Sequence, residues 1–93
     1  MSTQENARKL RELENKHPDT LKVLRGEAMV ELLDMDAVMK AGTSAMSDYR
    51  NDDSTWPDFI AKHLALGKHV AILPKGKDSI LIFVADRLFK KSR

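Results

Sequence analysis

The chain has no cysteine and no long apolar run, and each absence removes a class of protein. Without cysteine there is no disulfide scaffold, no thiolate metal site and no cysteine nucleophile, which fits a reducing compartment. No apolar run reaches the roughly 18 residues of a membrane span, and the N-terminus lacks the apolar core of a signal peptide. We therefore expect a cytoplasmic protein with no membrane segment.

Motifs for catalysis and for metal binding are also missing. The three histidines are scattered, and no pair has the i, i+4 spacing of a metal-binding helix. The acidic stretch around Asp52 lacks the central glycine and the final glutamate of a calcium loop. Gly76-Lys77 lacks the spacing of a phosphate-binding loop, and there is no GxSxG nucleophile elbow. The sequence therefore predicts no catalytic residues, no enzyme activity, no metal and no cofactor.

Aromatic residues are scarce, at five in total, which disfavours stacking on single-stranded nucleic acid. With 93 residues and 10.5 kDa, the chain is expected to form one domain over residues 1–93. Its 42% hydrophobic and 32% charged residues are typical of a folded domain. We expect residues 1–17 to include a loosely packed helix and residues 86–93 to form a basic tail.

The net charge of +2 conceals an uneven distribution along the chain. Residues 1–25 carry six basic and four acidic side chains, a net +2. Residues 26–58 carry two basic side chains against eight carboxylates, a net −6. Residues 62–93 carry eight basic side chains against two acidic ones, a net +6. This pattern indicates recognition of a charged partner.

Helical patterns dominate the first half. Residues 3–16 predict a short polar helix, and His17 before Pro18 predicts its end. Apolar residues then recur about every 3.5 positions from Leu21 to Met39, which predicts an amphipathic helix. Gly26 leaves open whether that helix is continuous or broken, and we favour a break.

The second half predicts helices and then strands. Gly42 and the Thr-Ser pair after it predict a helix over 44–50. Another helix is expected from about residue 55, with Pro57 in its first turn and Gly67 after its end. The runs 70–73 and 80–84, joined by a turn, predict a β-hairpin. The expected fold class is α+β, with N-terminal helices that include a helix-turn-helix-like pair, followed by a C-terminal β-hairpin.

The order of helix, Gly42 turn and helix in the centre of the chain is typical of a helix-turn-helix, which places one helix in the DNA major groove. The stretch 42–50, Gly-Thr-Ser-Ala-Met-Ser-Asp-Tyr-Arg, resembles the turn and second helix of small phage-type regulators of the AlpA/excisionase-like group. Trp56-Pro57 and Leu-Gly-Lys at 66–68 are similar to further elements of that group, and the terminal hairpin is similar to that of Cro-like regulators. The resemblance covers roughly residues 35–73.

This resemblance implies a transcriptional regulator that binds double-stranded DNA as a homodimer. The side chains expected to face bases are Ser44, Ser47, Arg50 and Asn51. The cations expected to face phosphates are Lys40, Lys68, Lys75, Lys77, Lys90, Lys91 and Arg93. The basic end of the chain would supply the attraction to phosphate that does not depend on DNA sequence.

The five consecutive apolar residues at 80–84 are too many for one buried face. Either both faces of this strand are covered within the chain, or a second subunit covers one of them. In a homodimer paired through the hairpin, the interface residues would be Ile80, Ile82 and Val84.

A second function would use the acidic segment instead. Residues 26–58 would bind a basic surface on a host or phage protein, and the chain would act as a small inhibitor or adaptor. The residues expected to contact such a partner are Asp48, Asp52, Asp53 and Trp56.

Overall fold

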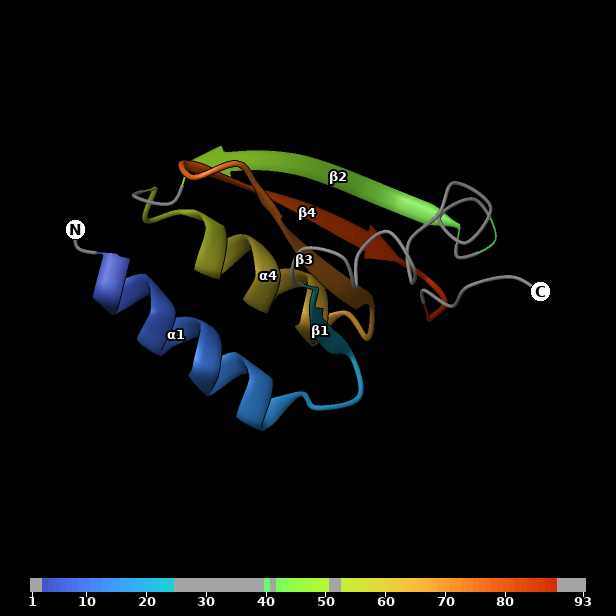
Figure 1. Ribbon diagram of the computed structural model, residues 1–93. Helices are drawn as coiled ribbons and strands as arrows, with labels where there is room; N and C mark the ends of the chain where they lie inside the picture. The colour runs from blue at the N-terminus through green and yellow to red at the C-terminus, as the bar shows by residue number, and fades with distance from the viewer. Residues whose placement is uncertain (1–2, 25–39, 41, 51–52, 89–93) are drawn as a thin grey trace.

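Among the described elements, each helix is followed along the chain by two strands (Figure 1). The computed structural model describes residues 3–24, 40, 42–50 and 53–88. In chain order the elements are α1 (Thr3–Lys16), β1 (Leu21–Val23), β2 (Thr43–Arg50), α4 (Trp56–Ala65), β3 (His69–Lys75) and β4 (Ser79–Ala85). Both helices lie on the same side of the sheet and contact each other.

The four strands form one mixed sheet in the order β1-β3-β4-β2. β1 runs parallel to β3, with Leu21 opposite Val70. β4 is antiparallel to β3 and to β2, and its pairing with β2 extends from Ala85 opposite Thr43 to Ser79 opposite Arg50. β4 therefore has a neighbouring strand on each side, and within the described residues β1 and β2 are the two edges of the sheet.

The core lies between the helices and one face of the sheet, which we call the helix face. From α4 the buried residues are Trp56, Ile60 and Leu64. From the sheet they are Leu21, Val70, Ile72, Ile82 and Val84. α1 adds Leu10 and Leu13, which are partly buried against the same cluster. Each fully buried aliphatic side chain stabilises the fold by about 1.5–3 kcal/mol relative to its exposed state.

The opposite face of the sheet, which we call the second face, also buries apolar side chains. Leu24, Ala71, Leu73 and Ala85 are buried there, with Leu81 and Phe83 packed against them. Because successive side chains of a strand point to opposite faces, the apolar runs in β3 and β4 supply both faces. Of the two alternatives for residues 80–84, coverage of both faces within the chain is therefore the one that the structure supports.

The predictions that rest on residues close together in the sequence are confirmed. α1 occupies the expected range, and β3 and β4 form the expected hairpin. α4 has Pro57 in its first turn, as expected. Gly67 follows the helix with a φ of +78°, a backbone conformation that favours glycine.

The helix expected from Leu21 onward is wrong at its start, because Leu21–Val23 is strand β1. The Val70 N–H donates to the Thr20 carbonyl at 2.8 Å, and the Leu24 N–H donates to the Ile72 carbonyl at 2.8 Å. Pairing with β3 therefore determines the conformation here. The rest of that predicted helix, including Gly26, lies outside the described residues except for Lys40.

The helix-turn-helix followed by a hairpin is also wrong. Residues 43–50, expected to form its second helix, are strand β2, and α4 lies between β2 and β3. Ala45 and Tyr49 pack against the core on the helix face, whereas Met46 is 61% exposed. The Tyr49 ring lies 5.7 Å from the Phe59 ring of α4, centroid to centroid. Pairing with β4 and the contact between Tyr49 and Phe59 outweigh the local preference of residues 43–50 for a helix.

Replacing Ile82 by alanine should lower the free energy of unfolding by about 2–5 kcal/mol, because Ile82 is 0% exposed at the centre of the core. Ile82→Val should cost only about 0.5–1.5 kcal/mol. Urea unfolding followed by circular dichroism measures both. Met46→Ala is the matched control on the neighbouring strand, with a change within about 0.5 kcal/mol. Equal effects of the two alanine variants would contradict this core.

Candidate functional site

Three of the four residues expected to face DNA bases lie on a strand and not on a helix. Ser44, Ser47 and Arg50 are on strand β2, and Asn51 lies outside the described residues. Ser47 is opposite Ile82, on the helix face, whereas Arg50 is opposite Ser79 and is exposed. The structure therefore provides no recognition helix at these positions.

Two of the lysines expected to face phosphates are paired with carboxylates of the chain itself. Lys75 Nζ lies 2.6 Å from Asp48 Oδ2, and Lys68 Nζ pairs with Asp86. Lys40 and Lys77 are exposed. The remaining members of that set, Lys90, Lys91 and Arg93, lie outside the described residues.

The expected dimer interface is occupied by the chain's own core. Ile82 and Val84 are 0% exposed, and Ile80 packs against the same cluster. The hydrogen-bonding edges of β4 are taken by β3 and β2. These three residues are therefore not available to a second subunit in the folded chain.

The residues expected to contact a partner protein are spread over different environments. Trp56 is only 4% exposed and belongs to the core. Asp48 is on β2 and pairs with Lys75, and Asp52 lies outside the described residues. Asp53 Oδ1 accepts hydrogen bonds from the Thr55 backbone N–H at 2.9 Å and the Thr55 hydroxyl at 2.7 Å. Of the described members of this set, only Asp48 is an exposed residue on a strand.

The two edges of the sheet differ sharply. β1 has three residues, one of which, Lys22, is exposed. β2 has eight residues and contains no proline and no lysine. Short strands, lysines and prolines are the usual means by which proteins prevent pairing at a sheet edge. By these criteria β1 is protected, whereas the outer edge of β2 has no neighbouring strand within the described residues and is irregular only near its start, between Thr43 and Ala45.

The second face of β2 carries the exposed side chains of Met46, Asp48 and Arg50. The Lys75–Asp48 ion pair reaches from β3 across β4 to β2, so the carboxylate of Asp48 is compensated locally. No hydrogen bond or ion pair involves the Arg50 side chain within the described residues. The free charge on this part of β2 is therefore positive, although the segment 26–58 is acidic overall.

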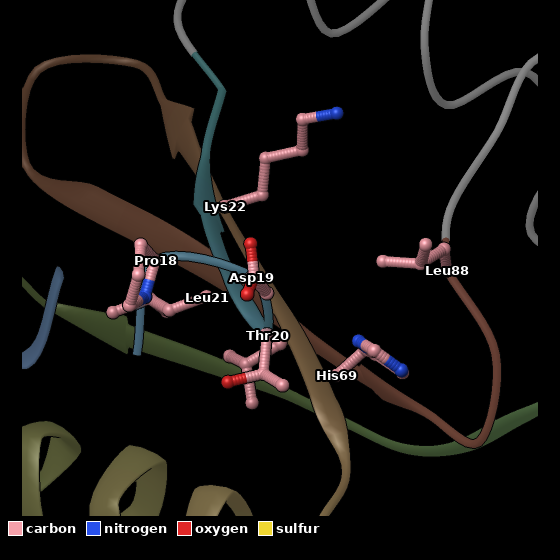
Figure 2. A pocket seen from close by; sticks show the side chains of 8 residues that line it. Pro18, Asp19, Thr20, Leu21, Lys22, His69 and Leu88 are labelled. Carbon is pink, nitrogen blue, oxygen red and sulfur yellow. The ribbon is translucent and has the colours of Figure 1, made fainter. Parts of the chain in front are cut away.

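A small pocket lies at the opposite edge of the sheet, beside β1 (Figure 2). It has a volume of about 190 Å³ and is lined by the Asp19 turn, Lys22 of β1, His69 of β3 and Leu88 after β4. His69 lies between Ala85 on the adjacent strand and, two positions along β3, Ala71.

Other features of the described chain give no indication of a cofactor or a membrane. Outside the gaps, no three His, Asp or Glu side chains gather closely enough to hold a metal ion. Neither of the two described helices is long and apolar enough to cross a membrane. Comparison of the chain with protein-family models, with curated proteins and with solved structures gave no match.

Sequence reasoning missed both edges of the sheet. The alternation of Ala45, Ser47 and Tyr49 with Met46, Asp48 and Arg50 is a period of two, and it could have identified β2 as a strand. No comparable signal identified the pocket, because Asp19, Lys22 and His69 meet only through the parallel pairing of β1 with β3.

Asp53 gives a prediction for stability. The Thr55 backbone N–H and then the Thr55 hydroxyl lower the pKa of Asp53 from its ordinary value, because both donate to the charged carboxylate. A lowered folded-state pKa stabilises the fold above the unfolded-state pKa, and this contribution is lost as pH falls through the folded-state pKa. Asp53→Asn should therefore lower the urea midpoint at neutral pH.

The difference between wild type and Asp53→Asn should begin to shrink below about pH 4, where the unfolded-state carboxyl becomes protonated, and should shrink further as pH falls through the lowered folded-state pKa. Urea unfolding at about pH 7 and about pH 3 measures this. Asp78→Asn in the hairpin turn is the control, since nothing in the described chain donates a hydrogen bond to that side chain. A pH-independent difference for Asp53→Asn would show that the Asp53 hydrogen bonds are not responsible.

Proposed function

We propose that this protein is a protein-binding module that takes up an extended segment of a partner protein along the open edge of β2. The observation that carries the proposal is the contrast between the two edges: β2 has eight residues with no proline and no lysine, and its register irregularity lies near its start, between Thr43 and Ala45, whereas β1 has three residues and a lysine. An eight-residue strand offers about 27 Å of edge. A partner segment would bind as an added strand, with main-chain hydrogen bonds as the source of affinity.

Exposed side chains on β2 would select the segment. Met46, 61% exposed, offers apolar contact. Arg50 offers a cation without a partner in the described chain, and Asp48 is compensated by Lys75. A segment with an apolar side chain opposite Met46 and an acidic one opposite Arg50 would complement this surface.

This proposal keeps the adaptor or inhibitor class expected from the sequence and changes the chemistry of the contact. β2 lies within the acidic segment, but its free charge is basic, so the partner segment is expected to be acidic. The lack of cysteine, which fits a reducing compartment, favours a partner in the cytoplasm, from a host or a phage.

Binding of double-stranded DNA has less support. The recognition helix is absent at residues 44–50, and Lys68 and Lys75 are paired with carboxylates. Attraction to phosphate depends on cations that release counterions from DNA, and lysines already paired in this way contribute less.

A matched pair of proline variants tests the proposal. Successive N–H groups of a strand point to opposite edges, so one of Met46→Pro and Ser47→Pro removes a bond to β4, and the other removes an outward donor. The variant that disrupts the outward edge should keep a urea midpoint close to that of wild type. It should bind partner segments at least tenfold more weakly, because an outward donor is lost and proline blocks strand addition at that point.

The probe is a displayed library of random peptides somewhat longer than β2, selected on the wild type. Selected peptides should carry an apolar and an acidic position four residues apart, opposite Met46 and Arg50, and they should protect β2 amides from hydrogen exchange. Peptides that bind the folded proline variant equally well would overturn the proposal. The proposal would also be overturned if the selection yielded no peptide and both the wild type and the proline variant retained a random DNA duplex at low salt.

A further inference from the structure

One side of α4 brings rings together beside strand β2. The Phe59 ring lies 5.7 Å from the Tyr49 ring of β2 and 4.5 Å from the His63 ring, centroid to centroid. All three side chains are partly exposed. We call Tyr49, Phe59 and His63 the aromatic strip.

The aromatic strip lies on the side of α4 that faces away from α1. Pro57 and Ala61 line a small pocket between α4 and α1. Residues two apart on an α-helix are separated by about 200° around its axis, so Phe59 and His63 lie on the other side. α1 contacts β1 and α4, whereas Phe59 contacts Tyr49 of β2 (Figure 1). The strip therefore adjoins the edge of the sheet where β2 has no outer neighbour within the described residues.

The placement of the few aromatic residues in this chain favours a contact surface here. Of the five, Trp56 is buried in the core, Phe83 packs on the second face, and Phe89 lies outside the described residues. The remaining two, Tyr49 and Phe59, both belong to the strip and are partly exposed. Aromatic side chains are enriched at protein interfaces, because each ring offers a large apolar area at a low cost in side-chain entropy.

A strand added to β2 would bring its own side chains to this strip. Ala45 and Tyr49 pack against the core on the helix face, and Ser47 lies between them opposite Ile82. Residues of a bound segment opposite these three would point to the same face, with Cβ atoms about 4.5–5.5 Å from theirs in an antiparallel pair. The residue opposite Tyr49 would lie against its ring, and the residue opposite Ser47 would reach that ring diagonally.

We propose that the segment bound at β2 places two large apolar side chains, those opposite Ser47 and Tyr49, on the aromatic strip. This inference rests on the proposed function and specifies the chemistry of the partner. The segment would be apolar toward the helix face and would carry an acidic residue opposite Arg50 on the second face. Because side chains alternate along a strand, the two large apolar residues would lie one and three positions from the acidic one, toward the position opposite Met46. A segment that is merely acidic would lack this pattern.

Peptides selected on the wild type test the inference through their own side chains. Alanine at either large apolar position should weaken binding by at least about tenfold, because most of the buried apolar area of that side chain is lost. Alanine outside the part paired with β2 is the matched control and should leave the affinity unchanged. In NMR spectra of the complex, nuclear Overhauser effects should connect both apolar side chains to the rings of Tyr49 and Phe59.

The outcomes separate this inference from strand addition itself. Peptides that protect β2 amides from hydrogen exchange, but tolerate both alanines and show no contact with the two rings, would overturn the inference and leave strand addition at β2 standing. A selection that yields no peptide would overturn both.

Variants of the strip provide the second arm of the experiment. Phe59→Leu keeps an apolar side chain against the core but removes the ring, and it should weaken binding of a peptide with an aromatic residue opposite Tyr49 roughly 3- to 10-fold. Tyr49→Thr removes the other ring while retaining a residue that favours a strand, and it should act in the same direction. Ala61→Ser, on the side of α4 that faces α1, is the unaffected control. The urea midpoint verifies that each variant is folded, and wild-type affinity in both ring variants would overturn the inference.

Discussion

Strand β4 is the constraint on which the rest of the structure depends. Its side chains are buried on both faces, with Ile82 and Val84 at 0% exposure on one and Ala85 at 0% on the other. A strand buried in this way must pair its backbone groups on both sides, because an unpaired buried N–H or C=O group costs about as much as a lost hydrogen bond. The hairpin with β3 satisfies one side only. The second side requires another strand, and residues 43–50 supply it.

This requirement explains which parts of the fold could be predicted. α1, α4 and the hairpin depend on signals within a few residues of each other, such as Pro57 and Gly67, and the sequence reveals them. β1 and β2 depend on partners far along the chain. β2 has polar residues on both faces and only one β-branched residue, Thr43, so its local preference is weak and its pairing with β4 decides its conformation. β1 is too short for any periodicity to be seen.

The same pairing changes the meaning of the charge pattern. Along the chain, the acidic segment 26–58 and the basic segment 62–93 are separate, and each suggested a different partner. In the sheet, β2 from the acidic segment lies beside the hairpin from the basic one, and Asp48 and Lys75 form an ion pair. Two residues assigned from sequence to competing functions thus compensate each other. Charge separated in sequence is not separated in space here, and the free charge that remains on β2 is that of Arg50.

The two edges of the sheet present different chemistry because they are built differently. At β1, a short parallel strand paired with β3 leaves a pocket of about 190 Å³ whose lining includes Asp19 and Lys22. At β2, a long antiparallel strand leaves backbone groups in a row, suited to a polypeptide. Three inter-strand spacings, about 14 Å, separate the edges, so a segment bound at β2 would not touch the pocket. Any influence of one on the other would have to pass through β3 and β4. Because those strands are packed on both faces, they resist the deformation that such coupling needs, and the two edges should act independently.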